Sequence, residues 1–306
     1  MIIWKNADIG CDSVKIGIIG GGAVGLLCAC YLSSRHQVTV ITRRTEQADA
    51  INTCGIRLVK DGKEFTASCR AQTGITFGYD LLIAAVKQHQ LSVVLPDLET
   101  IKGTNVLFLQ NGMEHINDIK EWRTDHSLYV GTVEHGAKRI SDHAVEHTGA
   151  GAVRWSVFRA SRPETLKSIF SGMHRDFPVY DENDWYRLLT GKLIINVCIN
   201  PLTALLRVQN GELLTNTAYK KYMRNVFEEA EAILGLVDKE EAWNRVCEVC
   251  GLTEKNHSSM LVDIMAGRRT EADAIIGYLV KEAENRGLPT VHLPFLHRSI
   301  KALERN

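Results

Sequence analysis

Residues 14–34 constrain the fold more than any other part of the sequence. Residues 14–19 form a short β-type run, the turn that follows carries glycines spaced as GxGxxG, and residues 26–34 continue with helical character. A strand, a glycine turn and a helix in this order are the context that a dinucleotide-binding fingerprint requires. We therefore expect a Rossmann-type domain, with a plain glycine-rich turn between strand and helix as the alternative.

Each residue of the turn has an expected role at a bound dinucleotide. Gly20 makes the tight turn, Gly22 lets the backbone approach a pyrophosphate, and Gly25 allows the helix to pack closely on the strand. Ala23 and Val24 lie in the same turn, before a helix whose first N–H groups and dipole favour a negative pyrophosphate. These five residues are the expected pyrophosphate contacts.

The second predicted strand, residues 37–42, ends in Arg43 and Arg44. An NAD site usually has Asp or Glu at this place for the ribose hydroxyls, whereas a basic residue favours the 2′-phosphate of NADP. The planar guanidinium of arginine can bind two phosphate oxygens at once. We therefore predict NADPH or NADP as the cofactor, with Arg43 the first candidate and Arg44 the second. The alternative is that both arginines are solvated surface charges.

Two further predicted strands end in polar residues. The apolar run 79–86 is typical of a buried parallel strand and is followed by Lys87, and residues 104–109 are followed by a turn that contains Asn111. Open α/β sheets bind ligands at the carboxyl ends of their strands. We expect Lys87 to line the cofactor cleft and Asn111 to meet cofactor or substrate. A surface lysine is the alternative reading of Lys87.

The pattern changes twice along the rest of the chain. Residues 128–158 show β-like stretches typical of an antiparallel extension, whereas nearly everything beyond residue 184 has helical character. We predict an α/β fold: an N-terminal Rossmann-type doubly wound sheet domain (residues 1–180), followed by an all-α C-terminal domain (residues 181–306), with the substrate cleft between them. Residues 1–13 precede the first strand and are predicted to be an extension.

Residues 192–200 form a second candidate site. No Gly or Pro interrupts them and Pro201 follows, so we expect a helix that ends there. Steps of four put Lys192, Asn196 and Asn200 on one face, whereas the other positions are apolar. These three side chains are either core polar groups that bond to neighbouring loops, or they line a cleft and point to a small oxygen-rich ligand. The glycine before Lys192 leads us to expect that the helix begins or loosens there.

Composition argues against several classes of protein. Lys plus Arg (36) equals Asp plus Glu (36), whereas a nucleic-acid binder shows a basic excess. Residues 1–13 lack a continuous apolar core and the longest apolar run, residues 16–32, carries five glycines, so we expect neither a signal peptide nor a membrane span and place the protein in the cytoplasm. A homodimer is compatible with the sequence, although no feature supports it.

The eight cysteines are scattered through predicted strands and helices. Cys247-x-x-Cys250 with His257 nearby is the one metal-like cluster in the sequence. A zinc site needs four ligands, and no second pair stands at a suitable spacing. We therefore expect helix-packing cysteines and no metal.

Seven spaced motifs carry a resemblance to a known family. They are Gly20-x-Gly22-Ala-x-Gly25, Val86-Lys87, Gln110-Asn111-Gly112, Lys192-x-x-x-Asn196-x-x-x-Asn200-Pro-Leu-Thr-Ala, Asn210-Gly-Glu-Leu, Ser258-Ser259-Met-Leu-x-Asp263 and Arg269-Thr-Glu271. Together they resemble the ketopantoate reductase (2-dehydropantoate 2-reductase) family, and the resemblance spans residues 14 to about 300. That is far more specific than the glycine fingerprint alone.

The resemblance implies a reaction and a set of site residues. The reaction is the NADPH-dependent reduction of ketopantoate to (R)-pantoate, a step of pantothenate and coenzyme A biosynthesis. Lys192 is the implied catalytic lysine and Glu271 its acidic partner. The implied substrate contacts are Asn111, Lys192, Asn196, Asn200, Asn210 and Ser259. The implied cofactor contacts beyond the glycine turn are Arg43, Lys87 and Asn111.

The residue types suit this chemistry, and two rival functions stay open. Hydride transfer to the carbonyl carbon builds negative charge on the carbonyl oxygen, which the Lys192 ammonium can stabilise and protonate. One rival is another NADP-dependent 2-keto acid reductase related to β-hydroxyacid dehydrogenases, which also carry a Lys-x-x-x-Asn helix. The other is a non-catalytic NADP(H)-sensing protein, although a sensor does not need a proton donor at the cleft.

Overall fold

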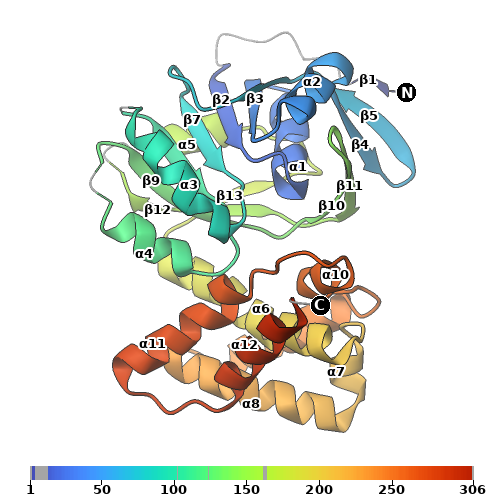
Figure 1. The fold of residues 1–306 in the computed structure, drawn as a ribbon, viewed down its shortest axis with the longest axis vertical. Helices are drawn as coiled ribbons and strands as arrows, with labels where there is room; N and C mark the ends of the chain where they lie inside the picture. The colour runs from blue at the N-terminus through green and yellow to red at the C-terminus, as the bar shows by residue number, and fades with distance from the viewer. Residues whose placement is uncertain (1, 4–12, 102, 123, 161–163, 305–306) are drawn as a thin grey trace. The chain divides into compact units, whose positions relative to one another are not determined.

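The chain forms two compact units in the computed structural model, which describes residues 2–3, 13–101, 103–122, 124–160 and 164–304 (Figure 1). The sheet unit comprises Met1–Gln110 and Trp122–Leu188, and the helical unit comprises Asn111–Glu121 and Leu189–Asn306. Most of the predicted extension, residue 1 and residues 4–12, lies outside the described residues.

The units do not divide the sequence at a single point. The predicted border between residues 180 and 181 falls a few residues before the one at Leu188. In addition, Asn111–Glu121 groups with the helices, although the chain on both sides of this segment belongs to the sheet unit. No local pattern in the sequence predicts that Asn111–Glu121 groups with the helices.

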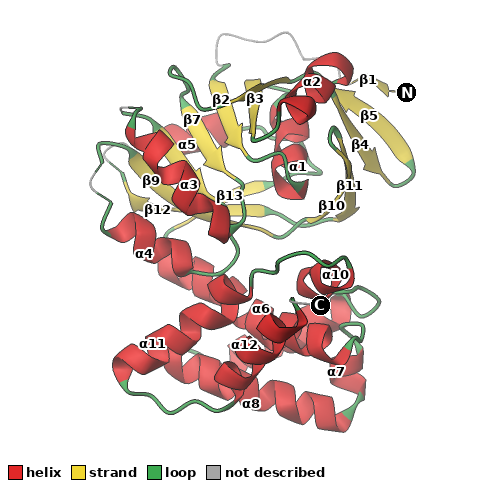
Figure 2. Cartoon of the chain, in the orientation of Figure 1, coloured by secondary structure: helices red, strands yellow, loops and turns green. Residues whose placement is uncertain are grey.

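Over the described residues, the larger sheet of the sheet unit has eight strands, drawn in yellow in Figure 2. Their spatial order is β13 (Val179–Glu182), β12 (Val153–Arg159), β9 (Ser127–Val133), β8 (Asn105–Phe108), β7 (Leu81–Ala84), β2 (Lys15–Ile19), β3 (Gln37–Thr42) and β6 (Arg70–Thr73). From β6 to β9 all neighbours are parallel, which gives the order 3-2-1-4-5-6 of a dinucleotide-binding sheet. The chain order reverses between β2 and β7, where such sheets bind ligands.

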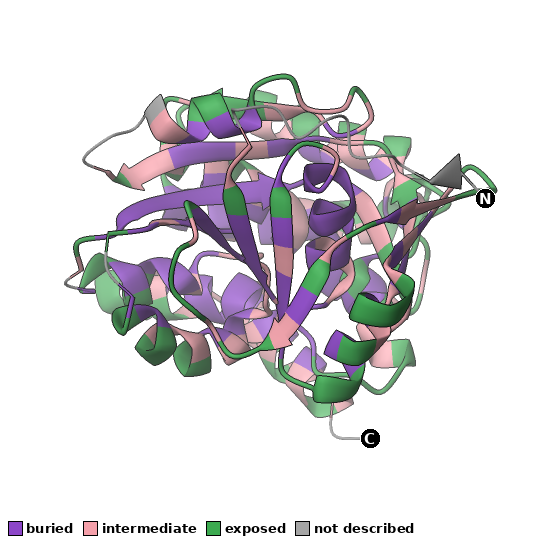
Figure 3. Ribbon diagram, turned by 90° about the horizontal axis from the view of Figure 1, so that it is seen from above, coloured by how far each residue is buried: buried purple, intermediate pink, exposed green. Residues whose placement is uncertain are grey.

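The central strands are apolar on both faces and are buried. Every residue of β7 is buried, and Ile16 and Ile18 of β2 are 0% exposed. Continuous apolar runs of this kind suit parallel strands that are covered on both sides. In Figure 3 the strands of the sheet unit are coloured mainly as buried. The helices of this unit are α1 (Ala23–Leu32), α2 (Thr45–Cys54), α3 (Gln88–Glu99) and α5 (Glu164–Phe170).

A second sheet packs against α1. Its order is β1 (Ile2–Ile3), β5 (Lys63–Ala67), β4 (Ile56–Lys60), β11 (Ala144–Gly149) and β10 (Gly136–Ser141). Because α1 contacts strands of both sheets, it lies between them. The predicted antiparallel extension at 128–158 needs a correction: β9–β12 and β10–β11 are antiparallel, but β9 is parallel to β8. The long connection from β8 to β9, which includes a helix, permits this parallel pairing.

The helical unit is built from α6, the helices after it and one helix from the middle of the chain. They are α4 (Glu114–Lys120), α6 (Trp185–Leu206), α7 (Glu212–Thr215), α8 (Thr217–Leu234), α9 (Lys239–Leu252), α10 (Ser259–Met265), the π-helix η1 (Asp273–Gly277), α11 (Tyr278–Arg286) and α12 (His292–Leu303). α8, α11 and α12 pack on one another, and η1 contacts α4 and α12. The apolar faces of these amphipathic helices form the core of the unit.

α6 is longer than the sequence predicted. Its 22 residues begin almost two turns before Lys192 and continue past Pro201, so neither the preceding glycine nor the proline ends the helix. Burial explains both corrections, because most side chains after Lys192 are inside the core and outweigh the local costs of Gly and Pro. The Thr203 hydroxyl donates to the Ile199 carbonyl at 2.9 Å, close to Pro201. α6 is long and apolar enough to cross a membrane, but 67% of that stretch is buried inside the protein, as is typical of a core helix.

Candidate active site

The glycine turn leaves open space at the N-terminus of α1. Gly20 has a φ of +114°, which favours glycine, and its N–H donates to the Ile41 carbonyl at 2.9 Å. A Cβ added at Gly22, the N-cap residue, would meet no atom within 4 Å, whereas one at Gly25 would lie 1.9 Å from the Gly20 carbonyl oxygen. Gly25 therefore lets the helix pack on the turn, and Gly22 leaves room beside the backbone.

Ala23 and Val24, both half-buried, begin α1. The first backbone N–H groups of a helix have no partner within the helix, and they carry the positive end of its dipole. Together with the open space at Gly22, these groups fit the pyrophosphate of a dinucleotide.

The two arginines after β3 differ in their surroundings. Arg44 forms an ion pair with Asp142 in the turn between β10 and β11, and the same carboxylate binds Arg139 at 3.0 Å. Arg43 is exposed, and within the described part of the chain it has no ion pair. The guanidinium of Arg43 is thus the one that a phosphate can engage without competition from a carboxylate.

The β10–β11 turn also reaches the glycine turn. Gln47 Nε2 donates to the Gly21 carbonyl at 2.8 Å and to the Asp142 carbonyl at 2.9 Å, and Arg139 Nη1 donates to the same Gly21 carbonyl at 3.3 Å. Sequence reasoning missed Asp142 and Arg139, because they lie about a hundred residues away and match no motif.

Lys87 and Gln110 stand at the carboxyl ends of neighbouring strands. Lys87 is half-buried at the N-cap position of α3, directly beyond β7. Gln110 is 3% exposed, and its Nε2 donates to the carbonyls of Ala84 at 3.0 Å and Val86 at 3.1 Å. Gln110 therefore ties the ends of β7 and β8 together.

Asn111 is bound to the helical unit. Its Nδ2 donates to Glu271 Oε2 at 2.8 Å, across 160 residues of sequence. The next two residues dock on η1: Met113 N–H donates to the Ala274 carbonyl at 3.2 Å, and Gly112 has a φ of +79°. A Cβ at Gly112 would lie 2.0 Å from that carbonyl oxygen, so only glycine fits there. The contact brings together two of the predicted site residues.

The polar side chains of α6 become more buried from Lys192 to Asn200. Lys192 and Asn196 are half-buried, and Asn200 is 8% exposed. Of the two serines near α10, Ser259 is exposed, whereas Ser258 is buried and caps the helix by accepting from the Leu261 N–H at 3.1 Å. The structure thus gives Ser258 a structural role and leaves the Ser259 side chain accessible.

Asn210 joins two loops of the helical unit. It is 7% exposed, its Nδ2 donates to Thr253 Oγ1 at 2.9 Å, and its N–H donates to the Asn256 carbonyl at 3.0 Å. The Cys250 thiol donates to the Asn210 carbonyl at 2.9 Å, and burial raises the pKa of that thiol to about 11. Among the described residues no group of three or more His, Cys, Asp or Glu side chains is arranged to hold a metal ion.

The candidate residues are sorted between the two units. The glycine turn, Arg43 and Lys87 belong to the sheet unit, and the catalytic and substrate candidates, which include Lys192 and Glu271, belong to the helical unit. A six-strand parallel sheet in this order with an open glycine turn, followed by a helical unit with a Lys-x-x-x-Asn helix, defines the class of two-domain, nicotinamide-dependent oxidoreductases.

Comparisons with known proteins narrow this class. Residues 16–160 match the family model described as ketopantoate reductase PanE/ApbA, and residues 184–304 match its C-terminal counterpart. The 2-dehydropantoate 2-reductase of Bacillus subtilis is 63% identical over 293 residues, covering 96% of this chain and 98% of that protein. The chain therefore belongs to the ketopantoate reductase family, and the predicted family and fold class are confirmed.

Solved structures agree with the fold. The crystal structure of the probable 2-dehydropantoate 2-reductase from Bacillus subtilis has a TM-score of 0.90 and 63% identity, covering 95% of this chain and 100% of that one. D-mandelate dehydrogenase, solved with NADH and anilino(oxo)acetate, has a TM-score of 0.84 at 23% identity, covering 95% of this chain and 98% of that one. The second likeness shows the fold alone.

Proposed function

We propose that this chain reduces ketopantoate (2-dehydropantoate) to (R)-pantoate with NADPH, a step of pantothenate and coenzyme A biosynthesis. The observation that carries the proposal is the hydrogen bond between Asn111 and Glu271 at 2.8 Å. It joins the residue expected at the cofactor and substrate to the expected acidic residue. Family membership over most of the chain supports the same reaction.

The sheet unit holds the cofactor in this proposal. Gly20, Gly22 and Gly25, with the N–H groups at Ala23 and Val24, bind the pyrophosphate, because the turn is open at Gly22 and the helix dipole favours an anion. Lys87 contributes a positive charge at the end of β7. When bound, the reduced nicotinamide supplies a hydride to the carbonyl carbon of the substrate.

Arg43 sets the preference for NADPH over NADH. Its exposed guanidinium follows β3, where an NADP site has its 2′-phosphate ligand. Arg44 is the weaker candidate, since the Asp142 carboxylate already engages it.

Lys192 is the proposed catalytic residue. Its ammonium is a hydrogen-bond donor with no acceptor role, so it stabilises the oxygen on which charge develops and then gives that oxygen a proton. Its position within α6, well after the first turn, holds it on a rigid element rather than on a fraying helix end.

The remaining polar groups align the substrate. We assign Asn196, Asn200, Asn210 and Ser259 to the substrate carboxylate and hydroxyl, which converts binding energy into orientation of the carbonyl. Ser259 is accessible, whereas the amide nitrogen of Asn210 already binds Thr253. The Asn210 carboxamide oxygen is buried and has no hydrogen-bond partner within the described residues, so a substrate hydroxyl would satisfy it.

Glu271 completes the site. With its carboxylate on the Asn111 amide, it orients the substrate hydroxyl or the lysine, and its charge opposes the desolvation that drives a buried lysine towards neutrality. We also propose that the enzyme is cytoplasmic. We further propose that it forms a homodimer, and light scattering on the purified protein would test its oligomeric state.

Turnover by the purified protein tests the proposal directly. NADPH oxidation would be followed with ketopantoate, beside 2-ketoisovalerate as the alternative substrate and NADH as the alternative cofactor. Fast turnover with ketopantoate and NADPH alone supports substrate and cofactor together. Faster turnover with another 2-keto acid would reassign the substrate, and tight NADPH binding without any turnover would favour a sensor.

A further inference from the structure

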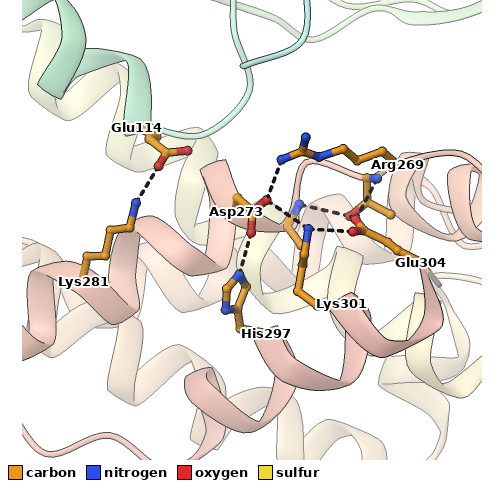
Figure 4. A network of polar contacts seen from close by, with 9 residues as sticks. Glu114, Arg269, Asp273, Lys281, His297, Lys301 and Glu304 are labelled. Atoms are coloured by element: carbon orange, nitrogen blue, oxygen red, sulfur yellow. Dashed lines mark hydrogen bonds and ion pairs between the residues drawn. The ribbon is translucent and has the colours of Figure 1, made fainter. Parts of the chain in front are cut away.

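The segment that carries Glu271 is anchored by the end of the chain. Thr270 donates to Glu304 twice, from its N–H at 2.9 Å and from its hydroxyl at 2.5 Å. On the other side of Glu271, Asp273 accepts from His297 Nε2 at 2.9 Å and Lys301 Nζ at 3.0 Å (Figure 4). We call His297, Lys301 and Glu304, from α12 and the residue after it, the α12 brace.

Lys301 links the two anchor points. Its ammonium lies 3.0 Å from the Asp273 carboxylate and 2.6 Å from the Glu304 carboxylate (Figure 4). One cation therefore bridges Asp273, which follows Glu271, and Glu304, which binds the residue before it. Arg269 adds a second cation to Asp273 at 3.1 Å. The hydrogen bond from His297, with those from Lys301 and Arg269, holds the pKa of Asp273 well below its usual range despite partial burial.

The anchor between Thr270 and Glu304 is buried, which fixes its geometry. Thr270 is 2% exposed and the Glu304 side chain 9%. The Thr270 hydroxyl also accepts from the Ala272 N–H at 3.1 Å, so both its donor and its acceptor directions are used. A hydrogen-bond network in such a poorly solvated place holds a turn more rigidly than the same groups would in water.

The brace is not needed to dock α12. The apolar face of that helix already does so, because Leu293, Leu296 and Ile300 are each 0% exposed. His297 and Lys301, in contrast, keep 26% and 29% of their side-chain surface exposed. Their partners nevertheless all lie in residues 269–273 or at Glu304, which itself holds Thr270.

Residues 269–273, which we call the Glu271 segment, also meet Asn111. The carboxylate accepts from Asn111, and the chain after Asn111 docks on the Ala274 carbonyl of η1. η1 is a π-helix, a rare geometry that is frequently found at functional sites. Glu271 thus lies between an anchor on α12 and a contact with Asn111.

We propose that the α12 brace is a positioning device for the reaction: it fixes the Glu271 carboxylate against Asn111, and its loss costs turnover rather than folding. The inference rests on the proposed role of Glu271 at the substrate. His297, Lys301, Glu304 and Thr270 act through Glu271 and are positioning residues. A displacement of about 1 Å in such a group can cost on the order of 100-fold in rate.

The first experiment compares two substitutions in α12 of the full-length enzyme. Lys301→Met removes the bridging charge at similar length, and Arg298→Ala removes an exposed charge from the same helix as the matched control. We expect Lys301→Met to lower kcat with ketopantoate by roughly 10- to 100-fold while the Kd for NADPH stays within about twofold. Arg298→Ala should leave both unchanged. A kcat for Lys301→Met within twofold of the parent overturns the proposal.

A double-mutant cycle separates positioning from general damage. If Lys301 acts through Glu271, then Lys301→Met should cost little further kcat in a Glu271→Ala background, because the positioned group is already gone. A merely structural role predicts that the two losses multiply, and that result overturns the proposal. Failure of the parent enzyme to reduce ketopantoate would instead count against the proposed function.

A pair of substitutions at Thr270 keeps the proposal testable if Lys301→Met folds poorly. Thr270→Val has the same shape without the hydroxyl, and Thr270→Ser retains the hydroxyl. We expect a roughly 10-fold or larger loss of kcat for the valine variant and recovery to within a few-fold for the serine variant. Equal activity of the two variants overturns the proposal.

Discussion

The glycine turn and the Glu271 segment hold their functional groups in different ways. At the turn the backbone does so: Gly20 has a positive φ, and Gly25 packs against its carbonyl, all within a few residues of sequence. Glu271 depends on side chains from far away, namely Asn111, 160 residues earlier, and the α12 brace. A backbone-built site is visible in a short motif, whereas a site built from side chains needs the tertiary structure.

The largest effect should come from Lys192→Ala, which separates the two units by function. We expect turnover to fall by about 10²–10⁴-fold, because the proton donor and the stabilising charge are lost together. NADPH binding should remain nearly intact, since the glycine turn belongs to the other unit. Steady-state kinetics and NADPH fluorescence titration check this, with Lys220→Ala, an exposed lysine of α8, as the control. More than a tenth of the activity left in Lys192→Ala would rule out the role.

Mild acid should weaken a buried histidine cluster and leave the Asp273 carboxylate ionised. His135 Nδ1 accepts from the Gly151 N–H at 3.1 Å and lies 3.0 Å from His147 Nε2, and His147 Nδ1 is hydrogen-bonded to the Tyr31 hydroxyl at 2.7 Å. Burial, with smaller contributions from His147 and Lys60, lowers the pKa of His135 to about 4. Burial also lowers the pKa of His147.

The sign of this effect follows from linkage. Between pH 6.5 and about 4 the unfolded chain binds a proton that folded His135 does not, so stability falls as the pH drops through this window, by roughly 3 kcal/mol. Asp273 has a lowered pKa, so its contribution is lost only as the pH falls below the usual carboxyl value of 3.8. Fully buried His115 in α4, with its pKa lowered to about 3 by burial, adds to the acid sensitivity.

Urea unfolding at pH 7 and pH 5 measures the effect. The variant His135→Gln removes one titrating group, so its stability should depend less steeply on pH than that of the parent. Identical pH dependence of the two proteins would show that His135 does not carry the effect.

Two glycine substitutions separate folding from binding at the turn. Gly25→Ala forces a Cβ to 1.9 Å from a backbone oxygen and should lower stability by about 1–3 kcal/mol or more. Gly22→Ala meets no protein atom, so its melting temperature should stay near that of the parent while NADPH binds more weakly. Calorimetry and NADPH titration report the two quantities. Full NADPH affinity in Gly22→Ala would place the pyrophosphate elsewhere.

The smallest effect expected concerns cofactor choice. Arg43→Ala should weaken NADPH by roughly tenfold, the loss of one charge-assisted contact, and change NADH little. Arg44→Ala serves as the matched neighbour, with a smaller effect because its guanidinium is held by Asp142. The dissociation constants of NADPH and NADH for each variant test this prediction. Equal losses of affinity for NADPH and NADH in Arg43→Ala would contradict a phosphate contact.

Much of the fold was accessible from local pattern. The strand at residues 14–19 and the buried strand β7 are continuous apolar runs, and such runs predict parallel strands well. α6 was misjudged at both ends, because Gly and Pro are weak local signals beside the burial of a whole helix face. The transfer of Asn111–Glu121 to the helical unit was not predictable, since it depends on docking to η1.

The sequence by itself determined the family, the reaction class and the strand, glycine turn and helix at residues 14–34. These follow from residues close together in the chain, where spacing alone fixes which groups share a turn or a helix face. Only the tertiary structure decided that Asp142 holds Arg44 and that Glu304 anchors Thr270, the residue before Glu271. Such contacts join residues far apart in sequence, and no local spacing specifies which distant side chains meet.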